Sequence, residues 1–493
     1  MTNGGFEHYD LHERSHRAMM DSGFEPAFSP EALRQAEQAS SITAPLHDSV
    51  PDRRDLRPLL WSSIDNRESL DLDQIEVAEM LPDGSIRLMV GVADVDLLVP
   101  ANSPIDRHAS RNRCSVYTGV EIYPMLPDRL SSNLTSLITG SDRAAIVISM
   151  DVDEEGEIVA SDIYPATTRN YARLSYDAVG DWLEDLGPMP DAVREVEGME
   201  AQLRLQKQVS QRLKLRRQRA GALDFETIEA EPVMHDGKVV DLSVPRKNVA
   251  RSMIENLMVS ANSTMALYLE HKHIPAIQRI VRSPERWPRI VELAARYHVH
   301  LPANADSVAL ARFLDAQKSV DPVHFPDLSL SIVKLLGPGE YEVVSEPTEH
   351  DGHFGLAVHS YTHSTAPNRR FADLVIQRLI KAAFVGEPAP YSPEELSTIA
   401  RGCTERENAA RKVERLMRKA AAAAMLMDRL GDVFDAIVTG ASPKGIYVRL
   451  LSPPVEGRVT RNECQLDVGD RARVRLIHAD PEKGFIDFEC LNG

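Results

Sequence analysis

The chain has 493 residues, of which 43% are hydrophobic and 26% are charged, and its formal net charge is −18 at pH 7. This length predicts two to four domains, and the composition is ordinary for a soluble globular protein. So acidic a chain is not expected to coat nucleic acid non-specifically, and without a long apolar run neither a signal peptide nor a membrane helix is predicted.

Residues 1–54 predict a small helical module. A helix is expected from His8 to Asp21, where Ser22-Gly23 ends it. Ser29 before Pro30 has the pattern of an N-cap followed by proline at the first helical position, which opens a second helix to about Ala39. Together they predict a helical hairpin or helix-turn-helix-like module, with a packing or RNA-guiding role favoured over DNA binding.

Three aspartates close together in sequence form the most informative segment: Asp65, Asp71 and Asp73. Carboxylates this close repel one another unless a hard divalent cation lies between them. The segment also lies between apolar runs, and loops on strand ends often carry the chemistry of enzymes. We therefore expect a magnesium site here, with solvated loop charges as the alternative.

Two later segments predict long helices. Residues 204–219 carry repeated Lys and Arg without an acid, so we expect a wall of an RNA path, although such a run is usually a solvated helix face. A second helix is expected over about 392–431. It begins at the N-cap Ser392 with Pro393 after it, and ends at Gly431.

From Val433 onward the hydrophobic pattern alternates. Five short strands separated by turn residues predict a small Greek-key barrel of the OB type over residues 432–493. The segment resembles the RNA-binding OB domain that is repeated in a large ribosomal protein. Its candidate RNA contacts are Tyr447, Arg449, Arg458 and Phe485, because bases stack on aromatic side chains. Tyr447 and Phe485 are equally consistent with a place in the barrel core.

The histidines and cysteines do not predict a metal centre. His350, His353, His359 and His363 fall within fourteen residues, but their spacing matches no zinc signature. The four cysteines, Cys114, Cys403, Cys464 and Cys490, have neither metal nor disulfide spacing. They indicate free thiols and a cytoplasmic location.

Several motifs in one order resemble the RNB exoribonucleases, the ribonuclease II and ribonuclease R family. Beside the aspartate segment, the matching stretches are Gly91–Asp94, Tyr123–Pro127 with Leu130-Ser131, Gly221–Phe225, Ile254–Asn262, His353–Leu356, Tyr361–His363 and Thr365–Asp373. The resemblance covers roughly residues 55–430. It implies an α+β multidomain protein with a mixed α/β RNB catalytic domain over 55–431, followed by the OB barrel. The helical segment 1–54 stands where the family usually has cold-shock OB domains.

The resemblance implies processive 3′→5′ hydrolysis of single-stranded RNA to nucleoside 5′-monophosphates. It implies a site with one or two Mg²⁺ ions, for which Mn²⁺ can substitute, and no DNA or membrane partner; we expect a monomer. By the same resemblance, Asp65, Asp71 and Asp73 are metal ligands, and Asp73 is also a catalytic residue. Arg369 matches the family's catalytic arginine, and Tyr117 matches the aromatic that stacks on the 3′-terminal nucleotides. Glu414 matches a residue that faces the channel, and Arg370 is a further candidate for RNA binding. Tyr117 as a core residue, Glu414 as a surface residue and Arg370 as a structural salt-bridge residue are the alternatives.

One position departs from the family pattern. Gln74 stands where the family has a fourth aspartate, and a carboxamide keeps an oxygen donor but loses a negative charge. We expect weaker metal binding, which a neighbouring acid, Glu68 or Glu76, would offset. A catalytically weak RNA-binding relative is the alternative function. A metal phosphohydrolase acting on small nucleotides is a second alternative, but it leaves the basic helix and the barrel unexplained.

Overall fold

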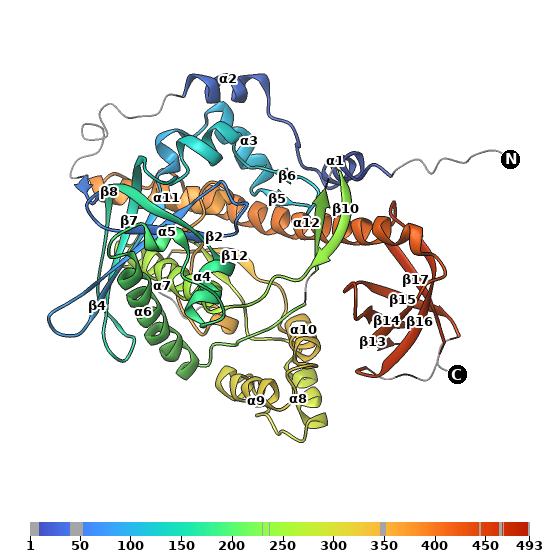
Figure 1. Ribbon diagram of the computed structural model, residues 1–493. Coiled ribbons are helices and arrows are strands. Elements are labelled where there is room, and N and C mark those ends of the chain that lie inside the picture. Colours follow the sequence, from blue (N-terminus) through green and yellow to red (C-terminus); the bar gives the residue numbers. More distant parts are fainter. Residues whose placement is uncertain are drawn as a thin grey trace.

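The computed structural model describes residues 9–39, 53–228, 230–235, 237–345, 352–442, 445–462, 466 and 468–491. His350 and Cys464, considered above, lie outside these residues. The predicted N-terminal helices, the basic helix, the long helix near residue 400 and the five C-terminal strands are confirmed. The predicted fold class is confirmed as well: a mixed α/β body with N-terminal helices and a C-terminal barrel (Figure 1).

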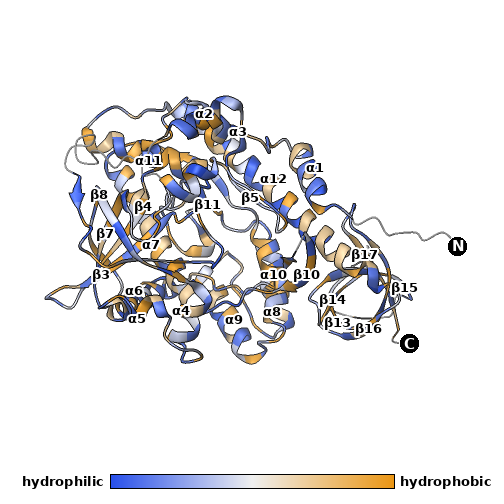
Figure 2. Cartoon of the chain, turned by 45° about the horizontal axis from the view of Figure 1, so that its top comes forward, coloured by the Kyte–Doolittle hydropathy of each residue, from blue (hydrophilic) through white to orange (hydrophobic). Residues whose placement is uncertain are grey.

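A curved sheet with the strand order β1-β8-β2-β3-β4-β7 forms the centre of the body. Because β8 pairs with β7 as well as with β2, the strands from β2 to β8 close a ring of pairings. Hydrophobic residues gather on these strands (Figure 2), which are largely buried. The strands are β1 (Arg54–Asp55), β2 (Trp61–Asp65), β3 (Gln74–Met80), β4 (Ile86–Ala93), β7 (Asp142–Val152) and β8 (Ile158–Ser175).

Helices cover this sheet and share its core. The basic helix α6 packs on β3 and on α7, and α7 also contacts β4 and β7. The aliphatic side chains of these helices, such as Leu203 and Leu257, are fully buried against the strands, which anchors the helices by burial of apolar area. The helices are α3 (Pro104–Asn112), α4 (Tyr176–Leu183), α5 (Asp191–Arg194), α6 (Met199–Arg219), α7 (Val249–His271) and α11 (Phe371–Val385).

Three further helices form a satellite with its own small core, in which Trp287, Phe313 and Phe325 are buried. These are α8 (Trp287–Arg296), α9 (Ser307–Val320) and α10 (Phe325–Leu336). Short strand pairs and single turns complete the body: β5 (Val116–Tyr117) with β6 (Ile122–Tyr123), β9 (Glu231–His235) with β10 (Lys238–Ser243), β11 (Ala276–Ile280) with β12 (Glu340–Val344), and the turns η1 (Val95–Leu97), η2 (Leu130–Leu134) and η3 (Phe354–Leu356).

The two N-terminal helices, α1 (Leu11–Asp21) and α2 (Pro30–Gln38), lie apart (Figure 1). Helix α1 packs on α12, whereas α2 packs on α3 and buries Ala32 and Ala36 in the core of the body. The expectation of a hairpin or helix-turn-helix-like unit is therefore corrected. Each helix presents its own apolar face to a different part of the body, so the pair has no core of its own.

Helix α12 (Pro393–Leu426) connects the body to the barrel. A capping box of Ser392 and Glu395 fixes its start, and it continues into the short turn η4 (Met427–Arg429). The closed barrel follows, with β13 (Val433–Ser442), β14 (Gly445–Leu450), β15 (Glu456–Arg461), β16 (Arg471–Asp480) and β17 (Phe485–Cys490). Ala422, Ala423 and Leu426 at the end of α12 share the barrel's core, so the helix and the barrel pack as one unit.

Polar contacts at two places also fix the barrel. Arg14 and Arg17 of α1 both bind Glu482 in the turn between β16 and β17, with Arg17 Nη2 2.9 Å from Glu482 Oε2. Tyr9 donates to the same carboxylate. On another side, Arg449 of β14 forms an ion pair with Asp327 of α10, at 2.9 Å between Nη1 and Oδ1. The barrel therefore contacts the N-terminal helix and the satellite as well as α12.

Candidate active site

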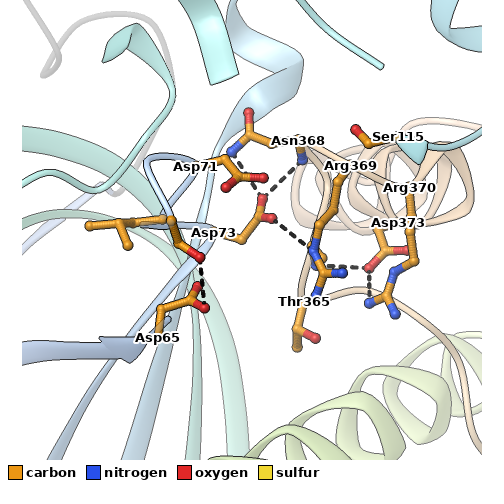
Figure 3. Close-up of polar contacts among 12 residues, drawn as sticks. Asp65, Asp71, Asp73, Ser115, Thr365, Asn368, Arg369, Arg370 and Asp373 are labelled. Atoms are coloured by element: carbon orange, nitrogen blue, oxygen red, sulfur yellow. Dashed lines mark hydrogen bonds and ion pairs between the residues drawn. The ribbon is translucent and has the colours of Figure 1, made fainter. Parts of the chain in front are cut away.

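The three aspartates lie around the end of β2 and the start of β3, joined by the loop 66–73. Several hydrogen bonds hold this loop. Asp65 Oδ1 accepts from the backbone N–H of Asn66 and from the Ser69 hydroxyl, at 2.7 and 3.0 Å. The backbone oxygen of Asp73 accepts from Ala93 N–H of β4 at 2.9 Å. The three aspartates that are close in sequence therefore lie in one region of the fold (Figure 3).

Asp73 is the most constrained of the three. Its side chain is buried, and Oδ1 accepts from both the backbone N–H and the side-chain amide of Asn368, each at 2.9 Å. Oδ2 has no hydrogen-bond partner among the described residues and lies 3.7 Å from Nε of Arg369. The pKa of Asp73 is raised to about 8: burial is the main cause, the charge of Arg369 opposes it, and the charge of Asp71 adds to it.

Arg369 and Arg370, adjacent in sequence, have different environments. The Arg369 side chain is 45% exposed and extends past Asp73 (Figure 3), so it remains available to a ligand. Arg370 Nη2 binds buried Asp373 at 2.7 Å, and the same Asp373 oxygen accepts from Ala366 N–H. Arg370 thus holds the loop that carries Arg369, which supports its interpretation as a structural salt-bridge residue.

Tyr117 connects the aspartates to α12. Its hydroxyl donates to Asp71 Oδ2 at 3.3 Å, and its backbone N–H donates to Glu414 Oε1 at 3.2 Å. The residue is 38% exposed, which argues against its alternative placement in a hydrophobic core. Burial raises the pKa of Asp71, the charge of Arg369 lowers it, and Asp65 raises it. Tyr117 therefore contacts both Asp71 and Glu414, which the sequence associates with it only through the family resemblance.

Gln74 and Glu76 lie on β3, beside the aspartate loop. Gln74 is partly buried and pairs with Val92 of β4. Glu76 is fully buried, and neither of its carboxylate oxygens has a hydrogen-bond partner among the described residues. Burial raises the pKa of Glu76 well above its usual range, and the charge of Asp65 raises it further. Glu76 is thus a buried acid on β3 that senses the charge of Asp65.

Two features of the site were not identified from the sequence. The first is the double hydrogen bond from Asn368 to Asp73, for which the only signal was the position of Asn368 directly before the arginine pair. The second is Tyr176 at the start of α4. Its pKa is raised by burial and then by the charges of Asp65 and Glu76, so its hydroxyl lies near both acids.

The predicted RNA-contacting residues of the barrel have different surroundings. Tyr447 and Phe485 are 42% and 56% exposed, which excludes the alternative that they form the barrel core. Tyr447 pairs with Arg458 across β14 and β15. Arg449 differs, because its guanidinium binds Asp327 and its side chain is only 11% exposed.

The basic helix α6 uses much of its charge within the protein. Arg204 and Arg216 form ion pairs with Glu200 and Glu157, and Arg212 donates to three backbone carbonyls. Arg217 donates to Asn256 of α7. These contacts favour a structural role for this face of α6 over the expected wall of an RNA path.

A divalent cation is the cofactor that the donor set suggests. Carboxylate oxygens are hard ligands, and the buried Asp73 Oδ2 and Glu76 oxygens lack hydrogen-bond partners, so a cation would satisfy them. Over the part of the chain that the structure describes, no three His, Cys, Asp or Glu side chains converge closely enough to enclose an ion as they stand. The residues therefore fit a cation in their chemistry, as oxygen donors, and not as a closed group of ligands.

Two of the four histidines considered for zinc, His353 and His363, have other partners. His363 Nδ1 lies 2.7 Å from the hydroxyl of Tyr341, and His353 Nδ1 accepts from Leu356 N–H at 3.1 Å.

In the described ranges, no helix is both long and apolar enough to cross a membrane.

Residues 53–386 match the RNB domain, and residues 432–491 match the RNase II-type exonuclease C-terminal S1 domain. The chain is 29% identical to ribonuclease R of Thermotoga maritima, over 94% of this chain and 68% of that protein. It is 28% identical to ribonuclease R 1 of Lactococcus lactis, of which it spans 59%.

Among solved structures, the fold matches Mycoplasma genitalium RNase R in complex with ribose methylated single-stranded RNA. The TM-score is 0.86 at 25% sequence identity, and the match covers 98% of this chain and 78% of that one. The likeness thus extends over both the body and the barrel.

Proposed function

Since the chain belongs to the RNB family, we propose that it is a metal-dependent exoribonuclease that degrades single-stranded RNA processively from the 3′ end and releases nucleoside 5′-monophosphates. The observation that carries the proposal is the pairing of Asp73 with Arg369, at 3.7 Å between Oδ2 and Nε. Hydrolysis of a phosphodiester needs an activated water and a positive group that compensates the phosphate charge. The Asp73 carboxylate suits the first need and the half-exposed guanidinium of Arg369 suits the second. The likeness to a ribonuclease bound to single-stranded RNA supports the choice of substrate.

The residues that would hold the cation, Mg²⁺ in this proposal, are Asp65, Asp71 and Asp73, with Gln74 in the fourth position. A bound divalent cation would supply Lewis acidity and an activated water at the scissile phosphate. The protein's own part is to fix the acids. The loop hydrogen bonds hold Asp65, and Asn368 holds Asp73, so their carboxylates do not have to be ordered when substrate arrives.

Arg369 is the group that would bind the phosphate. A guanidinium binds two non-bridging phosphate oxygens in a planar fork, and the exposure of Arg369 leaves its donors accessible. Arg370 holds the segment beneath it through Asp373. Because the Arg369 donors are already in place, they can stabilise the negative charge that develops on the phosphate in the transition state.

Tyr117 is the residue that would stack on a terminal base. Its ring is partly exposed, while hydrogen bonds with Asp71 and Glu414 fix the residue beside the carboxylates. A base stacked there would place the terminal phosphodiester near Asp73 and Arg369. The exposed Tyr447 and Phe485 of the barrel would bind RNA further from the 3′ end, by sequence-tolerant stacking.

The test is incubation of the purified full chain with 5′-labelled single-stranded RNA, with Mg²⁺ and with EDTA. Loss of full-length RNA with a short 5′-labelled end product and few intermediates, and with nucleoside 5′-monophosphates released, supports the proposal. RNA binding without loss of full-length RNA, at any Mg²⁺ or Mn²⁺ concentration, would show the catalytically weak relative that Gln74 suggests. Hydrolysis of free nucleotides without RNA cleavage would show the small-substrate phosphohydrolase.

A further inference from the structure

Asp65 takes its hydrogen-bond donors from its own loop. Its Oδ1 accepts from the backbone N–H of Asn66 at 2.7 Å and from the hydroxyl of Ser69 at 3.0 Å. The loop 66–73 that carries both donors contains neither helix nor strand. Two such donors orient a carboxylate only if their own residues are held in place. The contacts of Asn66 and Ser69 therefore decide how firmly Asp65 is placed.

An arginine from the sheet holds Ser69. Arg173 lies near the end of β8, paired with Ser63 of the neighbouring strand β2. Its Nη2 donates to the backbone oxygens of Arg67 and Ser69, each at 2.7 Å. Both hydrogens of this nitrogen are thereby used. Arg173 thus ties the turn that carries the Ser69 hydroxyl to the central sheet.

A second arginine holds Asn66. Arg251, in the first turn of α7, donates from Nη2 to Asn66 Oδ1 at 2.9 Å. Its guanidinium carbon lies 4.6 Å from the ring centroid of Tyr176, so the aromatic face supports the charged group. Tyr176 follows Arg173 by three residues in the sequence. Arg173 and the aromatic support of Arg251 therefore both come from the short segment where β8 ends and α4 begins.

We propose that Arg173 and Arg251 are positioning residues, which hold the Asp65 carboxylate through its own two hydrogen-bond donors. The inference rests on the proposed function, in which Asp65 takes part in hydrolysis. Each arginine acts through one donor residue, Arg173 through Ser69 and Arg251 through Asn66. The orientation of Asp65 is then set from outside its loop, by β8 and α7.

The competing explanation is that the two arginines bind RNA phosphates. Both side chains lie at the aspartate loop, and guanidinium groups commonly bind phosphate. Loss of either arginine would then weaken the affinity for RNA. Against this, Arg173 Nη2 is committed to two carbonyl oxygens and Arg251 Nη2 to a carboxamide oxygen. The two explanations differ in what loss of an arginine changes, the order of the loop or the affinity for RNA.

The experiment compares Arg173→Ala and Arg251→Ala in the full chain. Hydrogen–deuterium exchange of the loop amides is measured by mass spectrometry without metal and without RNA. Affinity for short RNA is measured without metal, and cleavage is measured in single turnovers with Mg²⁺. Arg169→Ala is the matched control, because Arg169 lies on the same strand and its side chain binds Asp142.

Both variants should raise the exchange rate of the amides at residues 66–69 by about tenfold or more, because the loop then opens locally. The amide of Leu72, which donates to the Ser136 hydroxyl, should keep its protection. The single-turnover rate should fall by about 10- to 100-fold, with RNA affinity changed by less than about twofold. Arg169→Ala should change none of these quantities.

Asn66→Ala tests the route by which Arg251 acts. It removes the acceptor of Arg251 and keeps the backbone N–H that donates to Asp65. Asn66→Ala should therefore reproduce the effects of Arg251→Ala, and the double variant should be no worse than either single variant. Normal loop exchange in Arg173→Ala and Arg251→Ala, or RNA affinity that falls in step with the rate, would overturn the inference.

If Arg173→Ala does not fold, Arg173→Lys is measured by the same criteria, since it keeps the charge and replaces the planar guanidinium. Exchange and cleavage report on different proposals. A chain that cleaves no RNA, but whose loop exchanges faster in both variants, would contradict the proposed function and support this inference. A chain that cleaves RNA equally well in every variant would do the reverse.

Discussion

Asn368 donates two hydrogen bonds to one oxygen of Asp73, from its backbone N–H and from its side-chain amide, each at 2.9 Å. The Asn368 side-chain oxygen in turn accepts from the hydroxyl of Thr135 at 2.5 Å. This chain of contacts fixes the orientation of the Asp73 carboxylate, so that its other oxygen faces Arg369. Three segments far apart in sequence thereby set the geometry of one acid.

Asp73→Asn should lower turnover by about 10³-fold or more, because the charge that would hold the cation and the attacking water is lost. The new side chain keeps an oxygen that can accept from Asn368, so the fold should persist. Single-turnover cleavage of short RNA measures the effect, with RNA affinity and the unfolding temperature as controls. Near-normal turnover would remove Asp73 from the catalytic group.

Asn368→Ala should lower kcat by about 10- to 100-fold while KM changes little, because Asp73 keeps its charge but loses one of the donors that orient it. Thr135→Val is the matched control, since it removes the contact behind Asn368, together with a bond to the backbone oxygen of Leu130, and leaves Asn368 itself in place. Its effect should be in the same direction and smaller. A rise in KM with unchanged kcat in Asn368→Ala would instead indicate a role in binding RNA.

Tyr117→Ala should weaken binding of short RNA by about 1–3 kcal/mol, the value of one stacked base. Tyr117→Phe keeps the ring and removes only the hydrogen bond to Asp71, so its affinity should stay close to that of the unchanged protein. The comparison is made by fluorescence anisotropy with RNA of a few nucleotides and without metal. Equal losses in both variants would show that the hydroxyl matters and the ring does not.

Tyr447→Ala and Phe485→Ala should weaken capture of long RNA while leaving hydrolysis of short oligomers intact, because both side chains are exposed on the barrel. Arg449→Ala should affect long RNA differently. It breaks the ion pair to Asp327 and should chiefly lower the unfolding temperature. Affinity for RNA of increasing length, beside thermal melts, separates the two effects. Loss of short-oligomer cleavage in Tyr447→Ala would place the barrel in the catalytic unit.

Protonation of His353 should contribute a fall of the unfolding temperature as the pH is lowered from about 6.5 to 4, and comparison with a variant separates this contribution from the buried acids, whose raised pKa values act in the opposite direction. Burial is the main cause that lowers the pKa of His353 to about 4, and the charge of Arg279 is the next. The unfolded chain, with a usual histidine pKa near 6.5, therefore takes up the proton first, and acid favours unfolding over this window. His353→Asn keeps an acceptor for Leu356 N–H and should reduce the fall. An unchanged pH profile in this variant would assign the effect to other groups.

The sequence predicted the local structure well because local rules govern it. Ser29 with Pro30 and Ser392 with Pro393 mark helix starts that the structure confirms. The alternating pattern after Val433 likewise became a closed barrel. The arrangement of α1 and α2 was predicted wrongly, since a short sequence distance between two amphipathic helices does not reveal which distant surfaces, here α12 and α3, their apolar faces will cover.

The site was predictable in its residues and not in their contacts. The motifs identify Asp73, Arg369, Tyr117 and Glu414 as candidates, but nothing in one chain reveals that Tyr117 N–H binds Glu414 or that Asn368 holds Asp73. The two residues of these pairs are 297 and 295 positions apart in the sequence. Arg449 likewise is of a residue type that often contacts RNA, and only the folded chain shows that it binds Asp327.

The contact of α1 with Glu482 sets an order of events during synthesis of the chain. Arg14 and Arg17 are synthesised early, whereas their partner Glu482 is synthesised 468 and 465 residues later. Domains generally fold as units while the chain emerges, at about 5–20 residues per second. Helix α1 must therefore wait about half a minute or more for the barrel turn that binds Arg14 and Arg17, whereas α12, which covers its apolar face, is complete before that turn. A nascent chain stalled before α12 should consequently be open to proteases at α1, and one extended beyond Glu482 should be protected.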